Sequence, residues 1–159
     1  VERSRGLGDV YKRQALCLLL LGCSAEKDYN TAIITAKGEV HYNLETAATP
    51  EQQAKGLMNR TSLSKDGGMI FVINPIRRVT MWMKDTKIPL DIIFINPEAK
   101  IVKIVENATP MSEEHLVSAE PVRAVIEISG GSAQKYGIKV GDKVKNAALG
   151  NMPAPKKEQ

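Results

Sequence analysis

Four short apolar runs follow one another closely in the middle of the chain. They cover residues 69–73, 79–83, 90–95 and 101–105, and turn-forming residues such as Pro75, Asp85 and Asn96-Pro97 lie between them. Each run is rich in apolar, partly β-branched residues and is shorter than a typical helix, which favours strands. Such short strands bury their apolar faces when the sheet closes on itself or packs on a second sheet. We therefore expect a mainly β fold, a compact antiparallel β-barrel or sandwich.

Further strands and two short helices complete one domain over residues 31–149. A hairpin-like pair is expected at 31–36 and 40–44, and later strands at 124–128 and 143–146. Thr49-Pro50-Glu51-Gln52 predicts a helix start, with Thr as N-cap and Pro first, and this helix should end near Asn59. A one-turn helix at 132–136 should end at Gly137. The 159 residues, 43% of them hydrophobic, suffice for a single globular domain.

The N-terminal part of the chain has the features of a secretion signal. Residues 15–22 (ALCLLLLG) form an apolar run shorter than the roughly 20 residues of a spanning helix. Leu20-Leu21-Gly22-Cys23 resembles the bacterial lipoprotein box, in which the Cys thiol is lipidated after cleavage. We therefore expect a lipid anchor at Cys23, on the periplasmic side of a bacterial cell envelope. Ser24 after the Cys favours the outer membrane.

The remaining segments lie outside the expected domain. Residues 1–14 (VERSRGLGDVYKRQ) resemble a translated adaptor sequence and are excluded from the fold reasoning, residues 15–23 form the signal and lipobox, and 24–30 form a linker. Residues 150–159 are expected to be a disordered tail. The formal net charge of +4 falls to +2 without residues 1–22, so nothing in the composition points to nucleic acid as a partner.

Most familiar catalytic and metal-binding patterns are missing. Cys17 and Cys23 belong to the signal, which leaves no thiol in the domain, and the two histidines, His41 and His115, have no metal-ligand spacing. There is no nucleophile elbow and no phosphate-binding glycine loop. Thioethers at Met81 and Met83, with Met58, Met69 and His41, are a possible cuprous site, but methionines in an apolar strand are usually core residues. We predict no metal and no cofactor.

The densest candidate site lies between the second and third apolar runs. It combines Trp82, Lys84 and Thr86 with Asp91, whose strand parity with Ile93 and Ile95 places a carboxylate on an apolar face. Such a carboxylate needs a partner, which Arg60 or Lys84 can supply. Two interpretations stay open: a polar pocket for an anionic or sugar-like ligand, or a buried ion pair that stabilises the turn. Glu127, between Ile126 and Ile128, raises the same question.

Several ordered motifs in this region also carry a family resemblance. They are GLMNR at 56–60, GMIF at 68–71, WMKDT at 82–86, IPLDIIFI at 88–95 and, after the Glu127 strand, YGIKVGD at 136–142. Together they resemble the bacterial and archaeal domain of unknown function 192 family, over about residues 31–147. The resemblance implies a compact, mostly β domain, often behind a secretion signal, and no established activity. Many relatives carry cysteines where this chain has Thr109-Pro110-Met111-Ser112.

These observations favour a non-enzymatic binding domain of an envelope lipoprotein. Its ligand would be a small polar molecule, an envelope polysaccharide or another envelope protein, bound through the cluster Arg60, Trp82, Lys84, Thr86, Asp91 and Glu127. The alternative is a hydrolase or transferase acting on an envelope glycan, with Asp91 as acid or base and Lys84 or Arg60 stabilising an anion. Whether there is catalysis is left open, with the balance against it.

Overall fold

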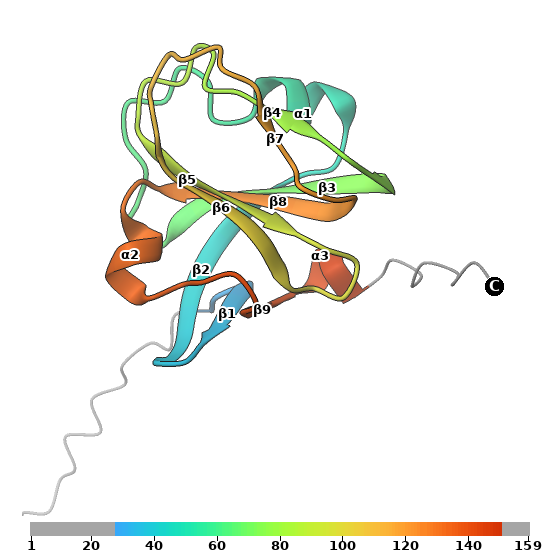
Figure 1. The fold of residues 1–159 in the computed structure, drawn as a ribbon. Coiled ribbons are helices and arrows are strands. Elements are labelled where there is room, and N and C mark those ends of the chain that lie inside the picture. Colours follow the sequence, from blue (N-terminus) through green and yellow to red (C-terminus); the bar gives the residue numbers. More distant parts are fainter. Residues whose placement is uncertain (1–27, 151–159) are drawn as a thin grey trace, which may run out of the picture.

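A computed structural model describes residues 28–150 of the chain (Figure 1). The expected leader, signal and lipidation site at Cys23 lie outside the described residues, as do most of the linker and tail. Among residues 28–150, no helix has the length and apolar character needed to cross a membrane.

The described chain is mainly β, as predicted, with one large sheet, one two-stranded sheet and three short helices. The large sheet has the order β6-β5-β8-β3-β2-β1-β9. Its strands are β1 (Thr31–Thr35), β2 (Gly38–Ala47), β3 (Gly67–Arg77), β5 (Leu90–Ile95), β6 (Ile101–Ala108), β8 (Val122–Ser129) and β9 (Lys143–Asn146). The small sheet pairs β4 (Thr80–Met81) with β7 (Leu116–Val117). The helices are α1 (Pro50–Lys55), α2 (Ser132–Tyr136) and α3 (Ala147–Gly150).

The large sheet curls into a half-barrel, and backbone hydrogen bonds bring its two ends together (Figure 1). The amide of Ile101 donates to the carbonyl of Asp142 over 2.9 Å, and the amide of Val144 donates to the carbonyl of Ala99 over 2.8 Å. Its strand pairs are antiparallel except β2 and β3, which are parallel. Parallel neighbours need a long crossover connection, and here the segment 48–66, which contains α1, provides it.

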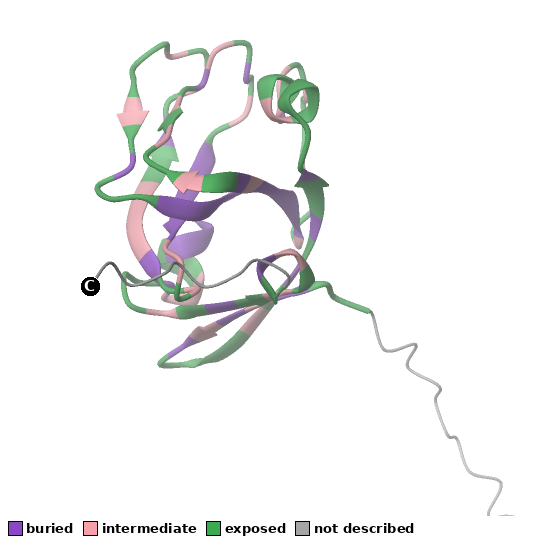
Figure 2. Ribbon diagram, turned by 90° about the vertical axis from the view of Figure 1, so that its right-hand side faces the viewer, coloured by how far each residue is buried: buried purple, intermediate pink, exposed green. Residues whose placement is uncertain are grey.

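The strands β3, β5 and β8 lie at the centre of the sheet and are buried on both faces (Figure 2). Their inner face packs inside the curl against β1, β2 and β9, through residues such as Ile33, Tyr42, Ile93 and Ile126. Their outer face packs against α1 and the loops around β4 and β7, through residues such as Leu57, Phe71, Met83 and Phe94. Burial on both faces explains why these strands appear in the sequence as continuous apolar runs.

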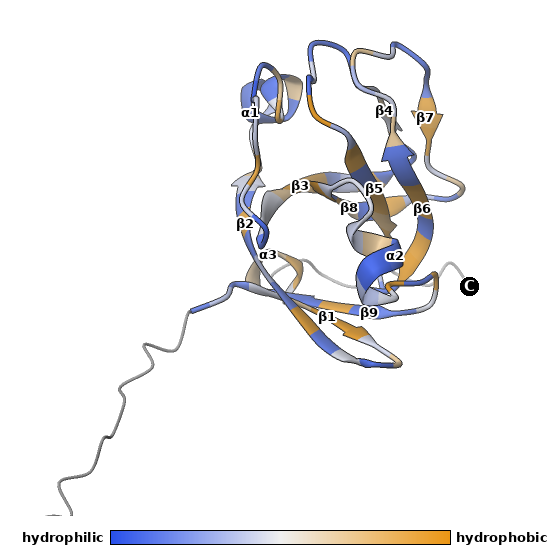
Figure 3. Ribbon diagram, turned by 90° about the vertical axis from the view of Figure 1, so that its left-hand side faces the viewer, coloured by the Kyte–Doolittle hydropathy of each residue, from blue (hydrophilic) through white to orange (hydrophobic). Residues whose placement is uncertain are grey.

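The helices α1 and α2 are mostly hydrophilic (Figure 3), whereas α3 packs Leu149 into the inner core. At α1 the predicted start is confirmed: the Thr49 side chain accepts a hydrogen bond from the Gln52 amide, and the Gln52 side-chain oxygen accepts one from the Thr49 amide. The helix ends at Lys55, earlier than the predicted Asn59, because Gly56 adopts a φ of 44°. A Cβ at Gly56 would lie 3.2 Å from the Phe71 ring, so α1 sits close against the sheet.

Candidate functional site

Asp91 is the fully buried carboxylate of β5 and is held by backbone amides. It lies on the inner face with Ile93 and Ile95, as its strand parity predicts. Its Oδ1 accepts from the amides of Asn107 (2.8 Å) and Gly131 (3.0 Å), and its Oδ2 accepts from that of Ala133 (2.7 Å). These three donors satisfy the carboxylate and join β5 to the end of β6 and the start of α2.

The expected ion pair between Asp91 and Arg60 or Lys84 is not formed. Arg60 makes a bidentate bond to Glu45, at 2.5 and 2.6 Å, which lowers the pKa of that glutamate. The ammonium of Lys84 lies 5.6 Å from the centre of the Trp82 ring. Both cations belong to loops on the outer side of the sheet, whereas Asp91 faces the inside of the curl. The sheet therefore separates Asp91 from the cations proposed as its partners.

Glu127 is the second buried acid, and its surroundings are different. Alternation along β8 turns its side chain to the outer face, beside Met69 on β3 and Ile92 on β5. The residue is only 5% exposed, and among the described residues no hydrogen bond or ion pair to its carboxyl is found, although its oxygens are not completely enclosed. Burial raises its pKa from 4.5 to about 8, and no neighbouring charge contributes to this shift. At neutral pH the buried carboxyl is therefore mostly protonated.

A cavity of about 80 Å³ lies over Glu127, between the outer face of the sheet and its covering segments. The surrounding side chains come from α1, the following turn, β3, β4 and the next loop: Gln53, Ala54, Lys55, Leu57, Met58, Phe71, Thr80, Met81, Trp82 and Thr86. Trp82 is 45% exposed and stands at the rim. An acid without a partner at the floor of a cavity is the pattern expected of a ligand site.

The structure gathers part of the predicted cluster around this cavity. Trp82, Thr86 and Glu127 line it, and Lys84 adjoins it through the Trp82 ring. Arg60 and Asp91 have other partners. Gln53 was missed by the sequence reasoning: its side-chain amide donates to the carbonyl of Val72 (2.7 Å), which holds α1 over the sheet. A polar residue in an amphipathic helix gives no sign of this role.

The methionines considered for copper do not form one site. Met58 and Met81 line the cavity, whereas Met69 and Met83 are packed in the outer core. His41 stacks on Tyr29, with ring centroids 5.5 Å apart, at a different place on the molecule. In the described part of the chain, no three His, Cys, Asp or Glu side chains are grouped to hold a metal ion.

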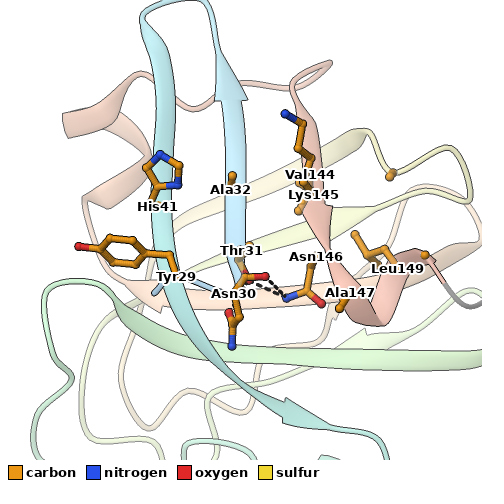
Figure 4. A pocket seen from close by; sticks show the side chains of 12 residues that line it. Tyr29, Asn30, Thr31, Ala32, His41, Val144, Lys145, Asn146, Ala147 and Leu149 are labelled. Atoms are coloured by element: carbon orange, nitrogen blue, oxygen red, sulfur yellow. Dashed lines mark hydrogen bonds between the residues drawn. The ribbon is translucent and has the colours of Figure 1, made fainter. Parts of the chain in front are cut away.

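A larger hollow of about 590 Å³ lies beside β1, β9 and α3 (Figure 4). Its central polar groups already bind one another, since the Asn146 side chain donates to the Thr31 hydroxyl (2.7 Å) and to the Asn30 carbonyl (3.2 Å). Its ionisable side chains, including His41 and Lys145, are exposed to solvent. Among residues 28–150, this hollow is lined by no buried ionisable group, so the cavity over Glu127 is the stronger candidate.

Comparisons with known proteins agree with the fold and assign this chain to no enzyme class. The model of the DUF192 family, described as uncharacterized ACR, matches residues 32–146. A crystal structure of a protein of unknown function from Novosphingobium aromaticivorans is 45% identical, with a TM-score of 0.71, covering 72% of this chain and 82% of that one. A putative transcription regulator from Sinorhizobium meliloti is 38% identical, with a TM-score of 0.72, covering 77% and 98%. No curated protein matches the chain.

Replacing Asp91 by Asn tests its structural role. The amide has one acceptor oxygen, and its NH₂ group would face an amide donor, so we expect the free energy of unfolding to fall by about 2–4 kcal/mol. The matched control is Asp142→Asn, a half-buried carboxylate that accepts one amide bond, from Lys139. Urea denaturation should show a change below about 1 kcal/mol for the control. Equal losses in the two variants would contradict this role for Asp91.

Replacing Glu127 by Gln tests the buried, unpartnered acid. Between pH 4.5 and about 8, the Glu127 carboxyl is protonated in the folded state and ionised in the unfolded state. The free energy of unfolding of the wild type should therefore fall as pH rises through this range. The variant lacks this titration. Its stability relative to the wild type should rise with pH by up to about 1.4 kcal/mol per unit and level off above pH 8. A difference that stays constant across this range, measured by denaturation at several pH values, would refute the assignment.

Proposed function

The chain belongs to the DUF192 family, which is uncharacterised, and from its site we propose a non-enzymatic domain that binds a small polar ligand over Glu127. The observation that carries this proposal is the Glu127 carboxyl, buried at the floor of a cavity without a hydrogen-bond partner in the described residues. A buried polar group without a partner costs free energy. A ligand that supplies the missing partner recovers this cost, which favours binding at this place.

The walls of the cavity supply both apolar contact and hydrogen-bonding groups. Trp82 and Phe71 offer aromatic surface, and the hydroxyls of Thr80 and Thr86 offer polar groups. The Thr86 hydroxyl already donates to the Lys84 carbonyl (3.1 Å), which leaves its oxygen as an acceptor. A mostly apolar pocket with a few polar groups is typical of small-molecule sites. Because the cavity is small, it accommodates one group of a ligand rather than a whole sugar.

The arrangement of the two buried acids favours binding over glycan cleavage. Glycosidases use two carboxyl groups on either side of the bond that they break. Here Asp91 lies on the inner face of the sheet and Glu127 on the outer face. Asp91 is also enclosed, with its oxygens bonded to three amides. The two acids therefore cannot act together on one substrate, and Arg60 is engaged by Glu45.

We place this binding domain in the bacterial cell envelope, anchored by lipid at Cys23. The support is the apolar run of residues 15–22 followed by a lipoprotein box. The acyl chains would supply the attachment, so the folded domain itself needs no affinity for the membrane. Its ligand would then be a small molecule or an exposed group of the envelope.

Binding at the cavity is tested with a fragment library that contains cations, anions and neutral polyols. NMR spectra of the protein should show shifts for some fragments at the residues that line the cavity. Trp82→Leu should remove most of the aromatic contact and weaken this binding by several fold. The control Glu113→Gln changes an exposed acid in the loop before β7 and should bind like the wild type. If no fragment shifts the cavity residues, the proposal fails.

The lipid anchor is tested by labelling the chain with fatty acid in a bacterial host. Label should enter the wild-type protein and be absent from Cys23→Ala, because the thiol is the site of acylation. The control Cys17→Ala keeps Cys23 and should be labelled like the wild type. Equal labelling of the wild type and Cys23→Ala would refute the anchor without affecting the binding site.

A further inference from the structure

We propose that the group entering the cavity over Glu127 is a small organic cation, a protonated amine that pairs with the Glu127 carboxylate. This inference rests on the proposed binding function and specifies the chemistry of its ligand. It is drawn from the charges around the cavity, from the nature of its walls and from its size.

Glu127 is neutral below its pKa of about 8, and the carboxylate that it forms at higher pH meets no counter-charge from the chain itself. Lys55 lies along the cavity, but its ammonium acts on Glu45, whose pKa it helps to lower. Lys84 lies on the Trp82 ring, and Arg60 is bound to Glu45. Among the described residues, no positive charge contributes to the titration of Glu127. A cation from outside would supply the counter-charge that the ionised carboxyl lacks and so favour its ionisation.

The walls of the cavity suit an organic cation better than a strongly hydrated ion. Phe71 and Trp82 present aromatic rings, and Met58 and Met81 present polarisable thioethers. Cations are attracted to the faces of aromatic rings, Trp most strongly. The chain shows this property at the same residue, since the Lys84 ammonium lies 5.6 Å from the centre of the Trp82 ring.

The size of the cavity limits what can enter. Its volume is about 80 Å³, against about 590 Å³ for the hollow beside β1, β9 and α3. A space of this size suits an ammonium group with one or two carbons better than a pyranose ring. The remainder of a larger ligand would extend past the exposed Trp82 at the rim.

The test compares three probes of similar size: ethylammonium, ethanol and acetate. Binding to the protein is followed by NMR shifts of the cavity residues and by Trp82 fluorescence, from pH 6 to 9 at constant ionic strength. Ethylammonium should bind at least tenfold more tightly than ethanol or acetate at pH 9. Its affinity should increase as Glu127 ionises, by up to tenfold per pH unit, and level off above pH 8.

Two variants separate the charge from the shape of the cavity. Glu127→Gln keeps the shape and removes the charge, so it should weaken ethylammonium at least tenfold at pH 9 and abolish the pH dependence. Glu113→Gln should leave the affinity for ethylammonium and its pH dependence unchanged. Thermal melts establish that each variant is folded before binding is measured.

The outcomes distinguish the inference from the function on which it rests. If ethanol or acetate binds at the cavity as tightly as ethylammonium, the proposal of a cationic ligand is refuted. The same holds if Glu127→Gln leaves ethylammonium binding unchanged. The proposed binding function is still supported if the neutral or anionic probes, or other fragments, change the NMR signals of the cavity residues. If no probe or fragment of any charge shifts them, the binding function itself is refuted, and the inference with it.

Discussion

The structure depends on the burial of β3, β5 and β8 between two apolar layers. One layer fills the inside of the curled sheet, and the other lies under α1 and the loops around β4 and β7. Strands in this position have no solvent-facing side, so nearly every side chain on them must be apolar or find a partner. This constraint applies most strongly to the two acids of these strands, Asp91 and Glu127.

The two acids meet the constraint in different ways. Asp91 receives three amide hydrogen bonds, two of them from the start of α2, and so joins the helix to the sheet. Glu127 receives none in the described structure and faces a cavity instead. A carboxylate that is fully bonded contributes to stability, whereas one without a partner lowers stability once it ionises. Such a cost is typical of a residue retained for function rather than for folding.

Much of the fold follows from patterns in the sequence, and the site follows only in part. The apolar runs predict the strands, and Thr49-Pro50 with Gln52 predicts the start of α1, because these signals are local. The parallel pairing of β2 and β3 was not predicted, because it depends on the path of the intervening connection. Trp82, Thr86 and Glu127 were identified as candidates, but Gln53, Phe71 and Thr80 were not. These residues come from separate elements that meet only after folding.

The sequence by itself determined the mainly β class and the family, since strand periodicity, helix caps and ordered motifs are properties of neighbouring residues. Alternation along a strand also determined that Asp91 and its neighbours Ile93 and Ile95 share one face. Only the tertiary structure decided which face that is and what it meets. It placed Asp91 inside the curl and Glu127 outside, because curling gives the two faces of one sheet different surroundings. This placement makes one acid a structural link and leaves the other available to a ligand.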